Sequence, residues 1–452
     1  MNKFKEYIYN SKYKCDKDIN ISKNEECITS YIKLRHYQKK YIRIAISIIE
    51  KNKCCFLYLR TGFGKSITMI DICSKIINEQ KLKGYVIIID NDLDNLQQIK
   101  NTIEDITDQD CMFFKGKLKK DKKFDVRFIV CTSIMSKKLS KDLVKNNCSI
   151  LVLDEIDTQC TSKRISSILR INPQYLIGMS ATKERYDGKD KFIDLLFGKN
   201  IITCPFPPVN IKFIYCDVEV EVYGRDYRQK YQKYLENISK NDERNRFLYK
   251  LIYNIFEKKI KIYKILNIEY NKIKIMIFTE RILHIKNLIE LLYNKFKKNY
   301  EILDLTYTKL KNKNYDFDKI INSFIITKII ENENGDKIKI KRRISTLIGD
   351  TVRYYESDIL ITNPKKAGRG FDESSYCDEH SGDEFNIQIR ASSVRSDPRH
   401  IQICGRMLRT DLPTIIHVID GNSYSQNHYN SNIESYEKRD MISSIEEMNV
   451  SF

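Results

Sequence analysis

The stretch that decides the fold is residues 54–66, CCFLYLRTGFGKS. An apolar run typical of a buried strand leads into a turn with two glycines, and Lys65 and Ser66 then open a helical pattern. A strand, a glycine-bearing loop and a helix N-terminus form a cradle for phosphate, because the backbone N–H groups of such a loop bind phosphate oxygens. The stretch therefore predicts a site for a nucleoside triphosphate.

The polar groups of this loop have distinct expected roles. Lys65 would reach the β- and γ-phosphates, and the Ser66 hydroxyl would be a ligand to Mg²⁺. Leu59 stands where the full motif has its first glycine, so an alternative interpretation is a glycine-rich turn that caps an ordinary helix. The other residues expected to contact the nucleotide here are Arg60, Thr61, Gly62, Phe63 and Gly64.

Length, composition and charge limit the classes of protein to consider. A chain of 452 residues is too long to fold around a single hydrophobic core, so two or more domains are expected. No run approaches the ~20 apolar residues of a membrane span, and the first residues lack the apolar segment of a secretory signal. The formal net charge of +19 favours a polyanionic partner such as nucleic acid, although AT-rich codon usage would also enrich lysine. The 13 cysteines are scattered without C-x-x-C pairs, which favours buried thiols in a reducing compartment over a zinc site.

Apolar runs that alternate with helical patterns predict an α/β fold with parallel sheets in two domains. In the first, strands are expected at residues 56–59, 86–89, 128–131, 150–153 and 175–179; in the second, near 274–278, 358–362 and 414–419. The expected division is an extension over 1–30, a first domain over 31–203, a linker and helical connection over 204–260, a second domain over 261–425 with an insertion or mobile loop near 305–350, and a tail over 426–452.

A second chemical signal lies in residues 150–157, ILVLDEID. Asp154 and Glu155 follow an apolar strand, and ligands in open α/β sheets bind outside the carboxyl ends of the strands. Asp154 is expected to hold Mg²⁺, and Glu155 is expected to orient and polarise the attacking water. Together with the phosphate loop, this acidic pair predicts nucleotide hydrolysis.

A third signal is residues 402–409, QICGRMLR, in which Gln402, Arg406 and Arg409 share one face of a helix. An arginine on such a face would stabilise charge on a transferred phosphoryl group, as an arginine finger does. The alternative is a solvated basic helix face. An arginine finger also requires two distant parts of the chain to form facing domains.

Two weaker signals concern Gln38 and residues 180–182. Gln38 lies in LRHYQ before the phosphate loop and is a candidate for reading the adenine edge, although the segment also fits the start of an amphipathic helix. Ser180 and Thr182 follow the strand at 175–179, where their hydroxyls would bridge the acidic pair to a neighbouring domain; the alternative is a helix N-cap.

In this order the segments resemble the motifs of superfamily 2 helicases. Residues 60–66 are similar to motif I, 154–157 to motif II, 180–182 to motif III and 402–409 to motif VI; 95–98, 131–133, 276–280, and 358–362 with 370–372 are similar to motifs Ia, Ic, IV and V. The resemblance implies two tandem RecA-like domains with ATP and Mg²⁺ in the cleft between them. It also implies that Gly370 and Asp372 contact ATP, and that Thr132, Ser180, Thr182 and Thr362 contact nucleic acid or couple it to hydrolysis.

Residues 177–188, IGMSATKERYDG, narrow the resemblance to the branch of phage UvsW-type and excision-repair translocases, and within it to the poxvirus transcript-release helicases. Lys183 replaces the usual proline, and the segment between motifs V and VI is long. The resemblance implies a DNA-dependent ATPase that acts on DNA or on transcription complexes, with RNA polymerase or elongation factors as partners and a viral factory in the host cytoplasm, or the virion, as its location. The alternatives are an RNA helicase, a translocase on duplex DNA, and a nucleic-acid-binding module with a degenerate nucleotide site.

Overall fold

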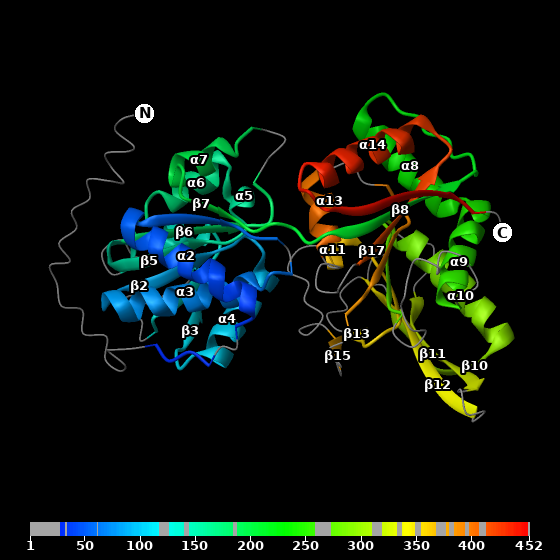
Figure 1. Cartoon of the computed structure of the whole chain (residues 1–452), viewed down its shortest axis with the longest axis horizontal. Helices are drawn as coiled ribbons and strands as arrows, with labels where there is room; N and C mark the ends of the chain where they lie inside the picture. The colour runs from blue at the N-terminus through cyan, green and yellow to red at the C-terminus, as the bar shows by residue number, and fades with distance from the viewer. Residues whose placement is uncertain are drawn as a thin grey trace. The chain divides into compact units, whose positions relative to one another are not determined.

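The computed structural model divides into two compact units (Figure 1). The first comprises Met1–Leu59 and Phe63–Cys204, and the second comprises Pro205–Phe452 together with the short segment Arg60–Gly62. Within the described part of the chain, no helix is long and apolar enough to cross a membrane. The described residues are 28–31, 34–60, 62–116, 126–139, 144–183, 188–257, 273–309, 319–331, 337–348, 354–367, 377–378, 384–393, 397–405 and 413–450.

The first unit is built on a seven-stranded sheet in the order β3-β4-β2-β5-β6-β1-β7, in which every pairing is parallel. All five strands expected from the sequence are present, and the two additional strands, β3 and β7, have three residues each. The strands are β1 Cys54–Tyr58, β2 Tyr85–Ile89, β3 Cys111–Phe113, β4 Phe128–Cys131, β5 Cys148–Leu153, β6 Tyr175–Ser180 and β7 Ile201–Thr203.

Helices cover both faces of this sheet, which explains why its strands are apolar without alternation. Cys55 and Leu57 of β1 belong to one buried cluster, and Phe56 between them belongs to the other. The first cluster includes side chains of α2, α3 and α4, and the second includes side chains of α5, α6 and α7. These helices are α2 His36–Asn52, α3 Lys65–Gln80, α4 Leu93–Ile106, α5 Ile156–Gln159, α6 Ser162–Ile168 and α7 Lys191–Phe197.

The second unit is built on a nine-stranded sheet in the order β10-β11-β12-β14-β9-β16-β17-β8-β18. The pairings of β10 with β11 and of β11 with β12 are antiparallel, and the others are parallel. The strands are β8 Val209–Cys216, β9 Ile275–Phe278, β10 Glu301–Lys309, β11 Lys319–Glu331, β12 Lys337–Leu347, β14 Ile359–Thr362, β16 Ile387–Arg390, β17 Thr414–Asp420 and β18 Ile442–Asn449; β13 Tyr354–Tyr355 and β15 Cys377–Asp378 form a separate pair.

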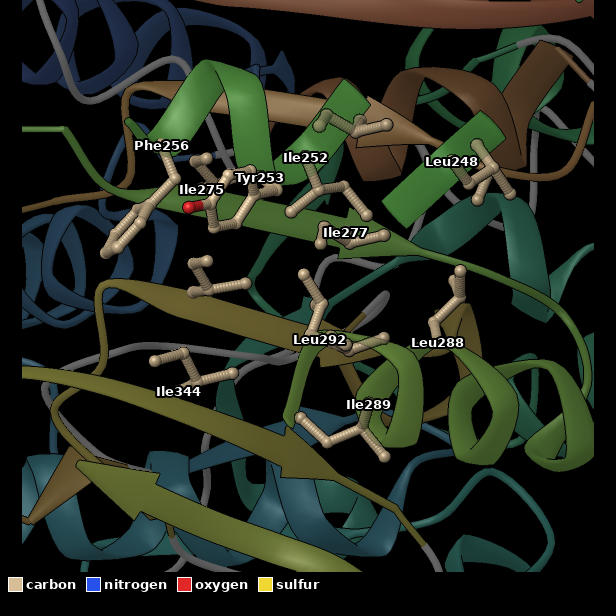
Figure 2. Packing of buried hydrophobic residues seen from close by; sticks show 14 of the residues in the cluster. Leu248, Ile252, Tyr253, Phe256, Ile275, Ile277, Leu288, Ile289, Leu292 and Ile344 are labelled. Carbon is tan, nitrogen blue, oxygen red and sulfur yellow. The ribbon is translucent and has the colours of Figure 1, made fainter. Parts of the chain in front are cut away.

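The main core of the second unit lies between its sheet and two long helices, α9 Asp242–Phe256 and α10 Ile282–Asn299. Figure 2 shows Ile252 of α9, Ile277 of β9 and Leu292 of α10 in this layer. A buried ion pair joins Arg244 of α9 to Asp420 of β17, with 2.5 Å between Nε and Oδ1. The remaining helices are α8 Tyr227–Lys240, α11 Pro364–Ala367, α13 Asp397–Cys404 and α14 Ser423–Glu437.

The structure corrects two expectations about the second unit. Residues 305–350 are not mainly a loop, because most of β10 and all of β11 and β12 lie there and extend the sheet. Residues 204–260 and 426–452 are not a separate linker and tail: β8 lies between β17 and β18 in the sheet, and β18 forms its edge. The polar residues that surround these strands in the sequence concealed them.

Candidate functional site

The phosphate loop lies between β1 and α3 of the first unit. Gly62 and Gly64 have φ angles of 75° and 84°, in the left-handed region that favours glycine, and Gly64 is the N-cap of α3. A Cβ atom on Gly64 would lie 2.5 Å from Nε2 of Gln38. Gly64 is therefore required both by the backbone angle and by the close approach of a side chain. Arg60 is partly buried, and Thr61 lies outside the described residues.

Gln38 fixes the loop from α2. Its side chain is 3% exposed; Nε2 donates to the Phe63 carbonyl at 2.9 Å, and Oε1 accepts from Arg35 N–H at 2.8 Å. The Phe63 ring packs against Tyr37 and Tyr41, with centroids 5.1 and 5.6 Å away. Both ends of the Gln38 amide thus bond to protein backbone, and contact with adenine stays a prediction.

The acidic pair lies at the carboxyl end of β5 and meets Lys65 of α3. The Lys65 ammonium forms an ion pair with Glu155 Oε1, and each side chain is 14% exposed. Burial opposes the charge of this ammonium, but Glu155 and Asp154 outweigh that effect and raise the pKa of Lys65. Burial raises the pKa of Asp154, and the nearby Lys65 only partly offsets it. Glu155 itself has a left-handed backbone, with φ 44° and ψ 53°.

Ser180, at the end of β6, bonds to the acidic cluster, and a bridge from it to a neighbouring domain stays a prediction. Its hydroxyl donates to Asp157 Oδ1 at 2.8 Å and lies 3.2 Å from Glu155 Oε2. Thr182 N–H donates back to the Ser180 hydroxyl at 3.0 Å. Both side chains are buried, so the hydrogen bonds of residues 180–182 run inward to the carboxylates.

Sequence reasoning missed Asp90 and Asn91, which follow β2 beside β5. The Asn95 amide bonds to Asp90 and lies 3.2 Å from Asp154 Oδ2. Burial, and then the charge of Asp154, raise the pKa of Asp90 to about 7. Asn91 accepts from Ser133 Oγ at 2.9 Å. Polar residues directly after the apolar run at 86–89 were the available signal, because that strand ends at the same edge as β5.

The remaining predicted residues lie at the ends of strands, in α13, or outside the described residues. Thr132 is partly buried after β4, and its hydroxyl accepts from Met135 N–H at 3.3 Å. Thr362 is fully buried at the end of β14, and its hydroxyl donates to the Leu347 carbonyl at 2.9 Å, so it bonds within the sheet. Gln402 lies in α13 of the second unit. Four residues lie outside the described part of the chain: Gly370, Asp372, Arg406 and Arg409.

The donor set at this edge of the first sheet fits Mg²⁺. Asp154 offers a carboxylate and Ser66 a hydroxyl, and Mg²⁺ is commonly held by one or two protein oxygens together with substrate phosphates and water. Among the described residues, no three or more His, Cys, Asp or Glu side chains are grouped to hold a metal ion. Phosphate and water would complete the coordination begun by these two protein oxygens.

Comparisons with known proteins relate the chain to helicases. Residues 31–185 match the family described as Type III restriction enzyme, res subunit. "Putative helicase 161L" of Invertebrate iridescent virus 6 is 25% identical over 418 residues, which cover 90% of this chain and 81% of that protein. "Putative helicase 109L" of Invertebrate iridescent virus 3 is 28% identical over 178 residues, covering 35% of this chain and 48% of that protein. A solved structure of a S. cerevisiae Dbp5 variant bound to RNA and ADP BeF3 shares the fold, with 13% identity, 91% coverage of each chain and a TM-score of 0.52.

Proposed function

Because this chain is a superfamily 2 helicase, and thus an ATP-dependent enzyme that acts on nucleic acid, we propose that its substrate is DNA and that it uses ATP hydrolysis to move along one DNA strand. The observation that carries the proposal is the meeting of Lys65, Glu155 and Ser180 at one edge of the first sheet. Residues 177–188, with their likeness to the UvsW-type branch, support DNA over RNA.

In this proposal Lys65 exchanges partners when ATP binds. Its buried ammonium neutralises Glu155 in the present structure, and the phosphates of ATP would compete for the same positive charge. Glu155 would then be released to orient the attacking water, while Ser180 holds its other oxygen in place. Mg²⁺, held by Ser66 and Asp154, would offset negative charge on the phosphates.

The second unit would supply the rest of the machinery. We assign the arginine finger to Arg406 and Arg409, with Gln402 on the same helical face, and further ATP contacts to Gly370 and Asp372. Binding of the nucleic-acid strand would be linked to ATP hydrolysis by four hydroxyl residues, Thr132, Ser180, Thr182 and Thr362. Transcription complexes would be the natural substrate and RNA polymerase or elongation factors the partners, in a viral factory of the host cytoplasm or in the virion.

Phosphate release by the purified full chain, measured alone, with single-stranded DNA and with single-stranded RNA, tests the choice of substrate. We expect stimulation by DNA to exceed stimulation by RNA, because the residues 177–188 resemble the DNA-directed branch. A larger response to RNA would replace the proposal with an RNA helicase. Release of transcript from a stalled elongation complex, measured with the same preparation, tests the transcription role.

Lys65→Ala should reduce ATP turnover at least 100-fold, because Lys65 would contact the phosphates of ATP. DNA binding should stay largely intact, because Lys65 would not contact the DNA strand. Lys75→Ala is the matched control: Lys75 lies on the same helix, is 43% exposed and pairs with Asp71 at 2.7 Å. Unchanged turnover in the Lys65→Ala protein would count decisively against the site.

A further inference from the structure

The strand β12 has two chemically different faces. Alternate side chains of a strand point to opposite sides of the sheet. Ile344 belongs to the buried core, and Arg342 is buried and paired with Asp358, with 2.8 Å between Nε and Oδ1. The intervening residues form what we call the β12 basic row: Lys337, Lys339 and Lys341, which are exposed, and Arg343, which is partly exposed.

The neighbours of the row are mostly uncharged. In the antiparallel register with β11, Lys339, Lys341 and Arg343 lie opposite Ile329, Thr327 and Ile325. Three acidic residues belong to the surroundings. Glu331 lies opposite Lys337, and Glu301 of β10 pairs with Lys339 at 3.5 Å. Asp358, which pairs with Arg342, also accepts from the Arg343 backbone N–H at 2.7 Å.

The ion pair between Glu301 and Lys339 does not neutralise the row. Both side chains of the Glu301–Lys339 pair are more than half exposed, so the pair is weak. The Arg343 guanidinium stacks on the Tyr355 ring, 4.6 Å from its centroid, which holds it in place without neutralising it. Among the described residues, Lys341 and Arg343 have no ion pair. The row therefore keeps an excess of positive charge on one face.

The lysine content of the chain does not by itself produce this row. β18, at the opposite edge of the same sheet, carries Glu446 and Glu447, which accept from Lys212 and Tyr215 of β8. A bias toward lysine codons would affect β12 and β18 alike. The positive charge is instead gathered on the side of the sheet formed by the antiparallel strands.

We propose that the β12 basic row binds the phosphodiester backbone of the nucleic acid on which the enzyme acts, as a contact surface separate from the helicase motifs; this inference rests on the proposed function. Alternate residues of a strand are about 6.7 Å apart, so the four groups span about 20 Å. One strand of B-form DNA presents a phosphate about every 3.4 Å along its axis, which gives about six phosphates over that length.

The chemistry of the row fits backbone recognition without sequence readout. Lysine ammonium groups on flexible stems act as point charges toward phosphate and do not select a base. Ile329, opposite Lys339, is 64% exposed and offers an apolar contact beside the charges. The β12 basic row would strengthen binding of the nucleic-acid strand and would take no part in ATP hydrolysis.

The test compares two triple variants of the full chain. One combines Lys337→Gln, Lys339→Gln and Lys341→Gln; the control combines Lys297→Gln, Lys298→Gln and Lys438→Gln, which are also exposed lysines of the second unit. Both change the net charge equally. The affinity for a fluorescent single-stranded DNA oligonucleotide is measured over a range of salt concentrations, together with ATP turnover at saturating DNA and the thermal unfolding midpoint.

For the row variant we expect the slope of log K against log salt to become less negative by about 2, because three lost phosphate contacts contribute about 0.7 each. The control slope and both turnover rates should stay at the wild-type values. Equal slopes in the two variants would overturn the inference and leave the proposed function standing. A wild type that binds neither DNA nor RNA would overturn both.

Discussion

At the scale of single residues, Gly64 shows how two requirements meet in one position. Its φ of 84° places it in the left-handed region, and Gln38 Nε2 occupies the space that a Cβ would need. The same amide holds Phe63 through its carbonyl. The glycine, the glutamine and the loop shape therefore depend on one another.

Gly64→Ala should weaken ATP binding at least 10-fold. An alanine in the left-handed region costs about 1–2 kcal/mol, and the first unit should lose more stability than this because Gln38 must also move. Nucleotide titration and denaturant unfolding measure the two effects. Gly188→Ala is the control, since Gly188 has φ 66° and a Cβ added there would meet nothing within 4 Å, so only the backbone cost applies. Equal losses in the two variants would refute the role of Gln38.

The residues of the site were predictable where they belong to a motif of consecutive residues. Lys65, Asp154 and Glu155 stand in short motifs after apolar runs, and the structure brings them together. Asp90 was not predicted as a site residue, because only the pairing of β2 with β5 places it beside Asp154. A single sequence does not state which strands are neighbours.

At the scale of elements, Arg390 joins β16 to α13, the helix that contains Gln402. It is 2% exposed and donates to the His400 carbonyl and to Cys404 Sγ, both at 2.9 Å. It also bonds to the His400 ring and to Gln388 Oε1. Among the described residues no carboxylate contacts this guanidinium, so its attachment to the helix rests on neutral acceptors.

Arg390→Met should lower the free energy of unfolding of the second unit by about 2–4 kcal/mol, because two or more buried acceptors lose their donor at about 1–3 kcal/mol each. Amide hydrogen exchange should also speed up in α13 more than in α10. Arg343→Met is the control, since this partly exposed arginine should change stability by no more than about 0.5 kcal/mol. Unchanged protection of α13 would contradict the role of Arg390.

Elements were predicted well where a strand is an apolar run between helical patterns, and poorly where polar residues surround it. The five expected strands of the first unit read as continuous apolar runs and are confirmed. β11 is largely apolar and β12 alternates lysine with isoleucine over residues 337–341, but the surrounding lysines and asparagines gave the segment the composition of a loop. Composition outweighed periodicity in that interpretation.

At the scale of the whole molecule, the second unit holds buried histidines that make it sensitive to acid. Burial lowers the pKa of His284, His400 and His417 well below the usual value; the charge of Arg244 adds to this at His284, and that of Arg390 at the other two. The one histidine among the described residues of the first unit, His36, is exposed.

The second unit should therefore lose stability as the pH falls below about 6.5. The unfolded histidines take up protons there while the folded ones do not, so stability is full above the unfolded pKa and falls by up to about 1.4 kcal/mol per pH unit for each histidine. Hydrogen exchange at pH 7.0 and 5.5, corrected for its intrinsic pH dependence, should show a loss of protection confined to the second unit. His284→Gln should reduce the slope, and an equal loss in both units would contradict this account.

The order of strands in the second sheet has a consequence for how the protein is made. β8 comes at the start of the second unit in the chain, yet its edge neighbour, β18, is formed by residues 442–449. While the ribosome is still adding the last residues, β8 exposes an edge without its partner, whereas the first unit can already have folded. A nascent chain stalled before residue 442 should thus carry a finished N-terminal half and an incomplete sheet prone to chaperone capture or self-association.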